Sequence, residues 1–323
     1  MLSQSIMGAP RVAVSGDYAG LVRAAHPAVA MMLYWFQLTR CVAMESLENL
    51  VPRLLELCHE AGTLICAHYH APGADRFESK GDDSPLTRAD LDSHACLQRG
   101  LLALEPSLPV LSEESSEEEL AQRRDWSRFW LVDPLDGTKE FLARTGEFTI
   151  NIALVDGHRP VLGLIYLPLE QVGYVGIPGS GAQCHHFERR TWHSRPLSIR
   201  GLEEGRPLTV LASRRHRGPR LMACLDWLTE QWGPIERDDS GSALKFCQLA
   251  AGTGDFYPRF TPCCEWDTGA GQALVEAAGG CLLGLDGAPL GYNQGDSLLS
   301  PNFYAIADPG HPLWQRLLDR GPF

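Results

Sequence analysis

Two segments far apart in the chain each place an aspartate at the end of an apolar run and then continue with small residues. The first is Trp130–Phe141, which contains the motif Asp-Pro-Leu-Asp-Gly-Thr at positions 133–138. The second is Trp266–Gly280, which begins Trp-Asp-Thr-Gly-Ala-Gly. This pattern predicts two strand-to-helix junctions with carboxylates at the C-terminal ends of strands, where open α/β sheets hold their ligands. The sequence therefore predicts a fold that contains both helices and sheets.

Length and charge limit the class of protein. The chain has 323 residues, enough for one large domain or two ordinary domains that share a site. A formal net charge of −12 excludes a binder of nucleic-acid backbones, because phosphate contacts need clustered Lys and Arg. A small phosphorylated ligand is compatible with this charge if metal ions neutralise it locally. The 10 cysteines form no zinc-type pair, which indicates reduced thiols and a cytoplasmic protein.

Residues 1–43 do not match the rest of the chain. Their one apolar patch, Ala28–Phe36, is shorter than a transmembrane span, and no basic start or compact apolar region indicates a signal peptide. We expect a poorly ordered N-terminal extension, with Met44 as the functional start and no membrane partner. A membrane-touching segment is the alternative.

Residues 44–205 predict an α+β part. Apolar residues from Leu47 to Ile65 recur at helical spacing, and Thr87 can cap a second helix. An acidic run ending at Glu119 is expected to be a solvated loop. Strands are expected at 129–133, 148–155, 161–167 and 172–176, with Asp156-Gly157 as a hairpin turn. This succession is a meander, which is typical of α+β folds.

Residues 206–323 predict an α/β part. A short strand is expected at 208–212, helices at 221–231 and 243–251, and a further helix opening at Trp266-Asp267. A closing hairpin is expected to begin at Cys281 and turn through Asp286-Gly287. This part would carry Asp267 and substrate-binding residues, and the 44–205 part would carry most of the metal ligands.

The carboxylates predict a metal site. Pro134 favours an extended Asp133, so that this residue ends a strand while Asp136 begins the following turn. Both side chains and the Leu135 carbonyl can then face one point, where Glu113 and Asp267 join them. Two unit charges ~4 Å apart repel by about 4 kcal/mol at an effective dielectric near 20. Carboxylates without histidine suit magnesium, and two close ions suit phosphate ester hydrolysis. Taken alone, however, Asp-x-x-Asp is more often turn or cap chemistry.

The two motifs, Asp133–Thr138 and the segment that begins at Trp266, together resemble the signatures of the inositol monophosphatase superfamily of lithium-sensitive, magnesium-dependent phosphatases. The surrounding residues are most similar to its CysQ-type branch, the 3′(2′),5′-bisphosphate nucleotidases. The resemblance runs from about Leu47 to about Ile306 and includes the segments Lys80–Asp90, Val110–Glu114, Gly146–Ala153 and Tyr257–Phe260. It implies a layered αβαβα sandwich and hydrolysis of adenosine 3′,5′-bisphosphate to AMP and phosphate.

The resemblance also implies roles for individual residues. Two or three Mg²⁺ ions would be held by Glu113, Asp133, the Leu135 carbonyl, Asp136 and Asp267. The catalytic pair that activates water would be Asp90 and Thr138, because a Thr hydroxyl that donates to Asp90 can accept from the attacking water. Asp90 would also stabilise the first turn of its helix. Substrate contacts would come from Glu113, Leu135, Asp136, Gly137, Thr138, Lys139, His216, Ser242, Lys245, Arg259 and Asp267.

Substrate choice rests on the basic residues among these. Lys245 and Arg259 are expected to neutralise a second phosphate, which favours a small phosphorylated nucleotide as partner. An inositol or sugar monophosphatase on the same fold is the alternative, and a non-catalytic phosphate-binding regulator is a further one. Cys263-Cys264 precedes Trp266-Asp267, so we also expect oxidation-sensitive thiols beside the metal site. The oligomeric state is left open.

Overall fold

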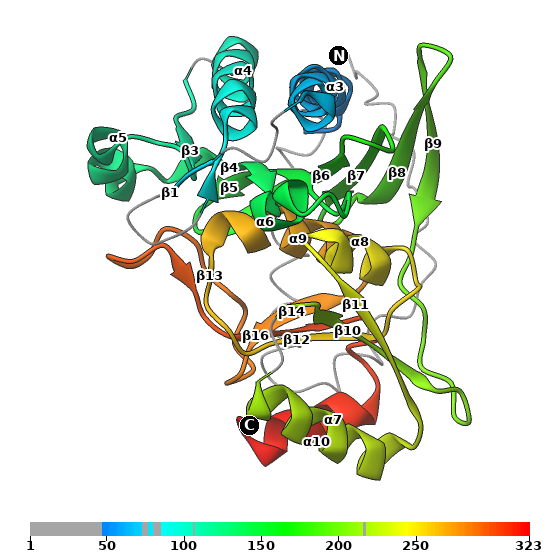
Figure 1. The fold of residues 1–323 in the computed structure, drawn as a ribbon. Coiled ribbons are helices and arrows are strands. Elements are labelled where there is room, and N and C mark those ends of the chain that lie inside the picture. The colour runs from blue at the N-terminus through cyan, green and yellow to red at the C-terminus, as the bar shows by residue number, and fades with distance from the viewer. Residues whose placement is uncertain (1–46, 73–76, 80–84, 106, 216–217) are drawn as a thin grey trace, which may run out of the picture.

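The chain folds into stacked layers of helix and sheet in the order αβαβα (Figure 1). The computed structural model describes residues 47–72, 77–79, 85–105, 107–215 and 218–323. The expected extension 1–43, the start at Met44 and the site residue His216 lie outside the described residues. None of the described helices is both long and apolar enough to cross a bilayer.

The first layer is a pair of helices, α3 (Val51–His70) and α4 (Arg88–Leu104) (Figure 1). Both were predicted. In α4 the N-cap Thr87 accepts from the Ala89 amide, and the Asp90 carboxylate accepts from the Thr87 amide in return, which forms a capping box. The buried leucines of the two helices pack on the neighbouring sheet in one apolar core with Trp130 and Ile152.

The second layer is a sheet of seven strands in the order β3-β4-β5-β6-β7-β8-β9. Only β3 and β4 are parallel, and the other neighbours are antiparallel, so the meander predicted for the first half is confirmed. The strands are β3 (Val110–Ser112), β4 (Arg128–Asp136), β5 (Thr149–Asp156), β6 (Arg159–Leu167), β7 (Val172–Ile177), β8 (Gly181–Glu188) and β9 (Thr191–Leu197).

The third layer contains α8 (Leu244–Ala250) and α9 (Glu265–Ala277), and α9 lies directly on the large sheet (Figure 1). Two strand glycines make this close approach possible. A Cβ at Gly163 would lie 2.3 Å from the Ala270 carbonyl oxygen, and one at Gly176 would lie 2.4 Å from the Leu274 Cα. Because neither contact is sterically possible, these positions need glycine.

The fourth layer is a sheet of five strands in the order β11-β10-β12-β16-β14. Its strands are β10 (Leu208–Ser213), β11 (Ile235–Ser240), β12 (Phe256–Arg259), β14 (Cys281–Gly284) and β16 (Phe303–Ile306). Strand β10 runs parallel to β11 and β12, whereas β16 is antiparallel to β12 and β14. The predicted α/β character is therefore confined to one edge of this sheet. The fifth layer, α7 (Pro219–Trp232) and α10 (Pro312–Arg320), covers its outer face (Figure 1).

Two local predictions were wrong. The acidic run near Glu119 is not simply a loop, because α5 (Glu117–Gln122) begins there, with Ser116 as N-cap and three glutamates in the first turn. Acidic side chains near the N-terminus of a helix are stabilised by its dipole. The hairpin expected after Cys281 is reduced to one antiparallel bridge between Leu283 and Pro289, and β14 pairs with β16 instead.

Candidate metal and substrate site

Three carboxylates from two distant segments converge, as the sequence predicts. Asp133 and Asp136 lie on β4 and Asp267 lies in the first turn of α9, and each offers an oxygen within 4.8 Å of the others. Two details were wrong. Asp267 does not end a strand, because β13 (Cys263–Cys264) is followed directly by α9 and Asp267 is the third residue of that helix. Strand β4 does not end at Asp133 but continues to Asp136, with an irregular register between the two. That irregularity lets both side chains face one point, since a regular strand would alternate their faces.

Local hydrogen bonds hold these aspartates. The Leu135 amide donates to Asp133 at 3.0 Å, and the Cys264 amide donates to Asp267 at 2.9 Å. Gly137 follows Asp136 with φ 91°, and a Cβ there would lie 2.8 Å from the Glu147 carbonyl oxygen. Only glycine suits this turn. The short helix α6 (Thr138–Leu142) begins directly after it.

The carboxylates are buried close to one another, where their negative charges are unfavourable. Burial, followed by the charge of Glu113, raises the pKa of Asp133 well above its usual range. Burial raises the pKa of Asp136 to about 6 and, together with the Asp136 charge, that of Asp267 to about 7. Buried acceptors that repel one another in this way suit a divalent cation, whose charge would offset them. The cluster therefore has the donor set of a metal site.

Glu113 lies beside this cluster but is not one of its three members among the described residues. It follows β3, and its amide donates to the Val132 carbonyl at 3.1 Å, which keeps it next to β4. Its charge contributes to the raised pKa of Asp133, Asp136 and Asp267. Its predicted role as a metal ligand stays a prediction.

The pair predicted to activate water also lies together. The Thr138 hydroxyl is 3.2 Å from the Asp90 carboxylate and 3.2 Å from the Leu135 carbonyl oxygen. Thr87 donates to the second oxygen of Asp90 from its amide at 2.8 Å and from its hydroxyl at 2.5 Å. Asp90 is therefore fixed by the α4 capping box while it faces Thr138, and the predicted role in the first helical turn is confirmed.

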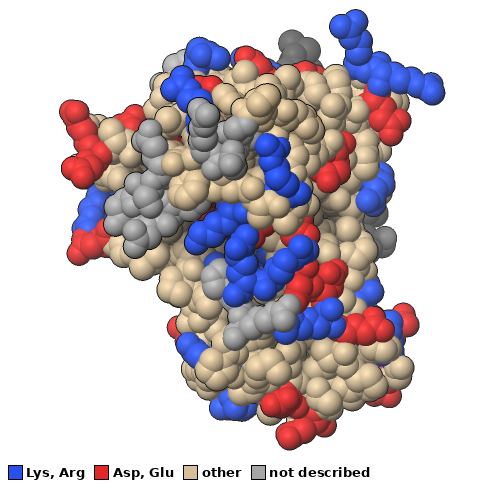
Figure 2. Space-filling view, viewed as in Figure 1, with Lys and Arg blue, Asp and Glu red and all other residues tan. Residues whose placement is uncertain are grey.

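A cavity of 390 Å³ opens beside the carboxylates. Seven of the predicted substrate residues line it: Asp136, Gly137, Lys139, Ser242, Lys245, Arg259 and Asp267. The cavity also has walls that sequence reasoning missed, among them Glu140, Tyr257 and Thr268, and Arg215 lines it as well. A gathering of Lys and Arg side chains is visible at the centre of this face, between the two halves of the molecule (Figure 2).

Lys245 supports one wall of this cavity. Its ammonium group is buried and donates to the carbonyls of Ser240, Gly241 and Ser242 at 3.0, 3.2 and 2.7 Å. Burial lowers its pKa to about 8. The loop that it holds presents Ser242 with φ 42°, and the buried Ser242 hydroxyl has no hydrogen-bond partner among the described residues. An unpartnered hydroxyl in a cavity wall is suited to bind a ligand.

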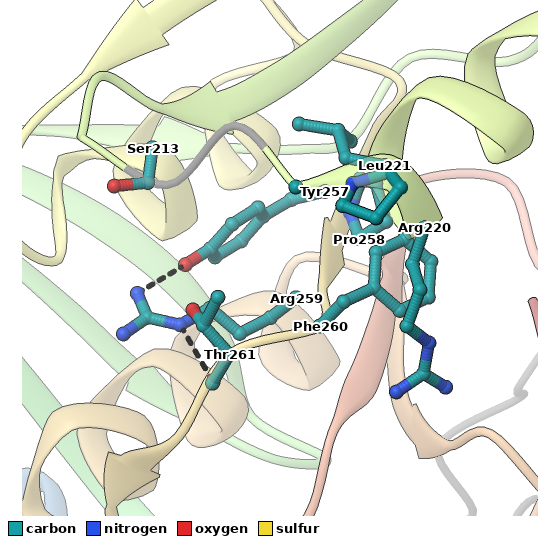
Figure 3. A pocket seen from close by; sticks show the side chains of 10 residues that line it. Ser213, Arg220, Leu221, Tyr257, Pro258, Arg259, Phe260 and Thr261 are labelled. Atoms are coloured by element: carbon teal, nitrogen blue, oxygen red, sulfur yellow. Dashed lines mark hydrogen bonds between the residues drawn. The ribbon is translucent and has the colours of Figure 1, made fainter.

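Arg259 lines both this cavity and a second, smaller one. Its guanidinium donates to the Tyr257 hydroxyl at 3.3 Å and to the Thr261 carbonyl at 3.2 Å (Figure 3). It also donates to the Pro262 carbonyl at 3.2 Å. The second cavity, of 150 Å³, shares Ser213, Tyr257 and Arg259 with the first. Its other walls are largely apolar and are formed by Pro219, Leu221, Pro258 and Phe260 (Figure 3).

The two cysteines beside the site have raised pKa values. Burial raises the pKa of the Cys263 thiol to about 12, and burial with the Asp267 charge raises the pKa of the Cys264 thiol as well. A raised pKa disfavours the thiolate through which oxidation proceeds. The expected oxidation sensitivity stays a prediction. In the described part of the chain, nine cysteines are free and none forms a disulfide.

Comparisons with known proteins agree with the fold. The model of the inositol monophosphatase family matches residues 46–313. The chain belongs to this family. It is similar to the 3′(2′),5′-bisphosphate nucleotidase CysQ of Escherichia coli (strain K12), with 39% identity over 254 residues that cover 79% of this chain and 98% of the relative. The Haemophilus influenzae protein of the same name is 30% identical and covers 81% of this chain and 94% of its own length.

Solved structures give the same result. The crystal structure of CysQ from Bacteroides thetaiotaomicron, a bacterial member of the family, superposes with a TM-score of 0.69 at 37% identity, covering 80% of this chain and 97% of the other. An inositol monophosphatase from Anabaena superposes with a TM-score of 0.63 at 24% identity, covering 86% of this chain and 98% of the other, and supports the fold alone. The αβαβα sandwich and the family resemblance are thus confirmed.

Proposed function

We propose that this protein is a magnesium-dependent 3′(2′),5′-bisphosphate nucleotidase that hydrolyses adenosine 3′,5′-bisphosphate to AMP and phosphate. The observation that carries the proposal is that one cavity joins the carboxylate cluster to the cationic side chains of Lys139, Arg215, Lys245 and Arg259. Carboxylates suit a cation, and additional positive groups suit a second phosphate. The names of the relatives support the same substrate.

The chain would hold the reactants with the residues already described. Glu113, Asp133, Asp136 and Asp267, with the Leu135 carbonyl, would hold two or three magnesium ions. These ions would supply positive charge at the phosphate and acidify the attacking water. The Thr138 hydroxyl would orient that water, and Asp90 would receive its proton through Thr138. The amides of Gly137 and Thr138 would bind the reacting phosphate.

The remainder of the nucleotide would extend into the second cavity. Tyr257, Pro258 and Phe260 offer the apolar surface that an adenine ring needs, and the shared residue Arg259 lies where phosphate and nucleoside would meet (Figure 3). Ser242 and Lys139 would contact the phosphates. We keep His216 as a nucleotide contact, although it lies outside the described residues.

A substrate panel tests the proposal. With magnesium present, we expect kcat/KM to be higher for adenosine 3′,5′-bisphosphate than for inositol 1-phosphate or a sugar phosphate, and chelation of the metal should abolish all release of phosphate. A preference for inositol phosphate would replace the proposal by the monophosphatase alternative. Release from none of these substrates, with magnesium still bound, would favour a non-catalytic regulator.

We propose a cytoplasmic enzyme whose partner is a small phosphorylated nucleotide, and we assign no oligomeric state. We also keep the division into a 44–205 part and a 206–323 part, with the cavity between them formed by α6 on one side and by β10, α8 and β12 on the other.

A further inference from the structure

Arg215 lines the main cavity from the segment that follows β10. Its Nε donates to Glu140 Oε1 at 2.6 Å, and its Nη2 is 3.3 Å from the Lys139 carbonyl oxygen. Its side chain is 47% exposed, whereas that of Glu140 is only 10% exposed. Among the described residues, no protein group accepts a hydrogen bond from Nη1. One edge of the guanidinium is therefore anchored and another is left for a ligand.

The anchor comes from the catalytic side of the cavity. Glu140 and Lys139 belong to α6, the helix that begins with Thr138. A guanidinium fixed by this helix keeps a constant position relative to the reacting phosphate. Because its conformation is already restricted, a ligand that binds it pays little of the usual entropy cost of a long side chain.

The other cations that line the cavity differ from Arg215. The Lys245 ammonium donates to three carbonyls, and each of the three guanidinium nitrogens of Arg259 has a protein partner. Lys139 is exposed and offers a point charge on a flexible stem. Arg215 combines an anchored position with a donor edge that has no acceptor in the described part of the chain, which is the arrangement that recognises a phosphate group.

We propose that Arg215 is a specificity-determining residue that binds the second, non-reacting phosphate of the substrate through its Nη1 edge. Glu140 is the positioning residue that holds it. This inference rests on the proposed nucleotidase function, and it assigns to Arg215 the discrimination between bisphosphorylated and monophosphorylated nucleotides.

The neighbouring Arg214 provides a matched control. It forms an ion pair with Glu147, donates to the Asp239 carbonyl at 3.2 Å, and lines a different cavity. It has the same charge and adjoins Arg215 in the sequence, but it does not line the substrate cavity in the described structure. A general loss of positive charge would therefore affect both variants, whereas phosphate recognition would affect only one.

The experiment compares Arg215→Ala, Arg215→Lys and Arg214→Ala on adenosine 3′,5′-bisphosphate and adenosine 3′-monophosphate. We expect Arg215→Ala to raise KM for the bisphosphate about tenfold or more with little change in kcat, because a charge-assisted hydrogen bond is lost. KM for the monophosphate should stay near the wild-type value. Arg215→Lys, which can still pair with Glu140, should keep the thermal midpoint and show a smaller rise in the same direction.

Several results would overturn the inference. Equal changes in KM for both substrates, no change for either, or the same bisphosphate-specific change in Arg214→Ala would each show that Arg215 does not recognise the second phosphate. Failure of the proposed function is visible separately, because the wild-type protein would then show no preference for the bisphosphate in the first place.

Discussion

Asp133 has the strongest electrostatic conflict of the cluster, since it is buried and lies near the charges of Glu113, Asp136 and Asp267. We predict that Asp133→Asn loses phosphate release by at least about a hundredfold in kcat, because several kcal/mol of transition-state stabilisation depend on the metals it would hold. Its metal-free thermal midpoint should not fall, since the change removes a repelled charge. Exposed Asp226→Asn is the control. A near wild-type kcat in Asp133→Asn would contradict the assigned metal site.

The raised pKa values of Asp136 and Asp267 predict a pH-dependent response to magnesium. In the metal-free chain both groups bind protons more strongly when folded than when unfolded. Their contribution to stability is therefore greatest at low pH and is lost as pH rises toward about 7. Magnesium needs the ionised groups, so it should raise the thermal midpoint more at pH about 8 than at pH about 5.5. Calorimetry with magnesium and with chelator checks this, and an equal effect at both pH values would contradict it.

The sequence predicted the acidic residues better than the basic ones. Two distinctive sequence motifs at strand and helix ends contain Asp133, Asp136 and Asp267, and these motifs indicate a shared site. Arg215 does not belong to such a motif. Its role depends on contacts with Glu140 and with the Lys139 carbonyl, 75 and 76 positions away. Likewise, no local pattern indicates that Lys245 is occupied by three backbone carbonyls.

At the scale of elements, Asp255 ties the start of β12 to the start of β10. Its buried carboxylate accepts hydrogen bonds from Arg200, from Arg206 and from the Thr209 amide. Burial alone would raise the pKa of Asp255, but these hydrogen bonds hold it below its usual range. It therefore stabilises the fold above the unfolded pKa and loses this effect in acid.

We predict that Asp255→Asn lowers the free energy of unfolding by about 2 kcal/mol at neutral pH, because both partly buried arginines lose a charged acceptor. Denaturant titration measures this change, with Asp226→Asn again as the exposed control. The difference from wild type should shrink as the pH is lowered. An unchanged denaturation midpoint would show that the arginines find other acceptors.

Elements with a clear apolar period were predictable, and those without one were not. The helices α3 and α4 follow from leucine spacing and from the Thr87 cap. The strands β9 and β11 carry mostly exposed or half-buried residues, so they lack the apolar signal that marks a strand. The helix α5 was missed because its six residues are mostly polar and none is buried, so the segment has no apolar period to mark a helix.

At the scale of the whole molecule, all described parts of the site come after residue 47, and the family model begins at residue 46. We predict that a chain starting at Met44 keeps the thermal midpoint and the kcat/KM of the full chain. Parallel melting and activity measurements on the two chains test this. A large loss on truncation would show that residues 1–43 contribute to the fold or to the site.

The order of the layers was accessible only through the family resemblance. The spacing of apolar residues distinguishes the antiparallel meander of residues 44–205 from the mixed helices and strands of residues 206–323. It does not place α9 between the two sheets. That placement depends on long-range contacts, such as those of Gly163 and Gly176 with the α9 backbone. Such contacts join residues about 100 positions apart and have no local sequence signal.

The close seating of α9 on those two glycines has a consequence for how the protein could change over evolutionary time. The α9 helix, which carries Asp267, meets β6 and β7 backbone against backbone at Gly163 and Gly176, so no side chain can be exchanged at these two points. The surfaces proposed to select the substrate lie elsewhere, on Arg215 and on the 257–261 segment. New substrates can therefore be acquired by altering those surfaces while the catalytic spacing is inherited unchanged.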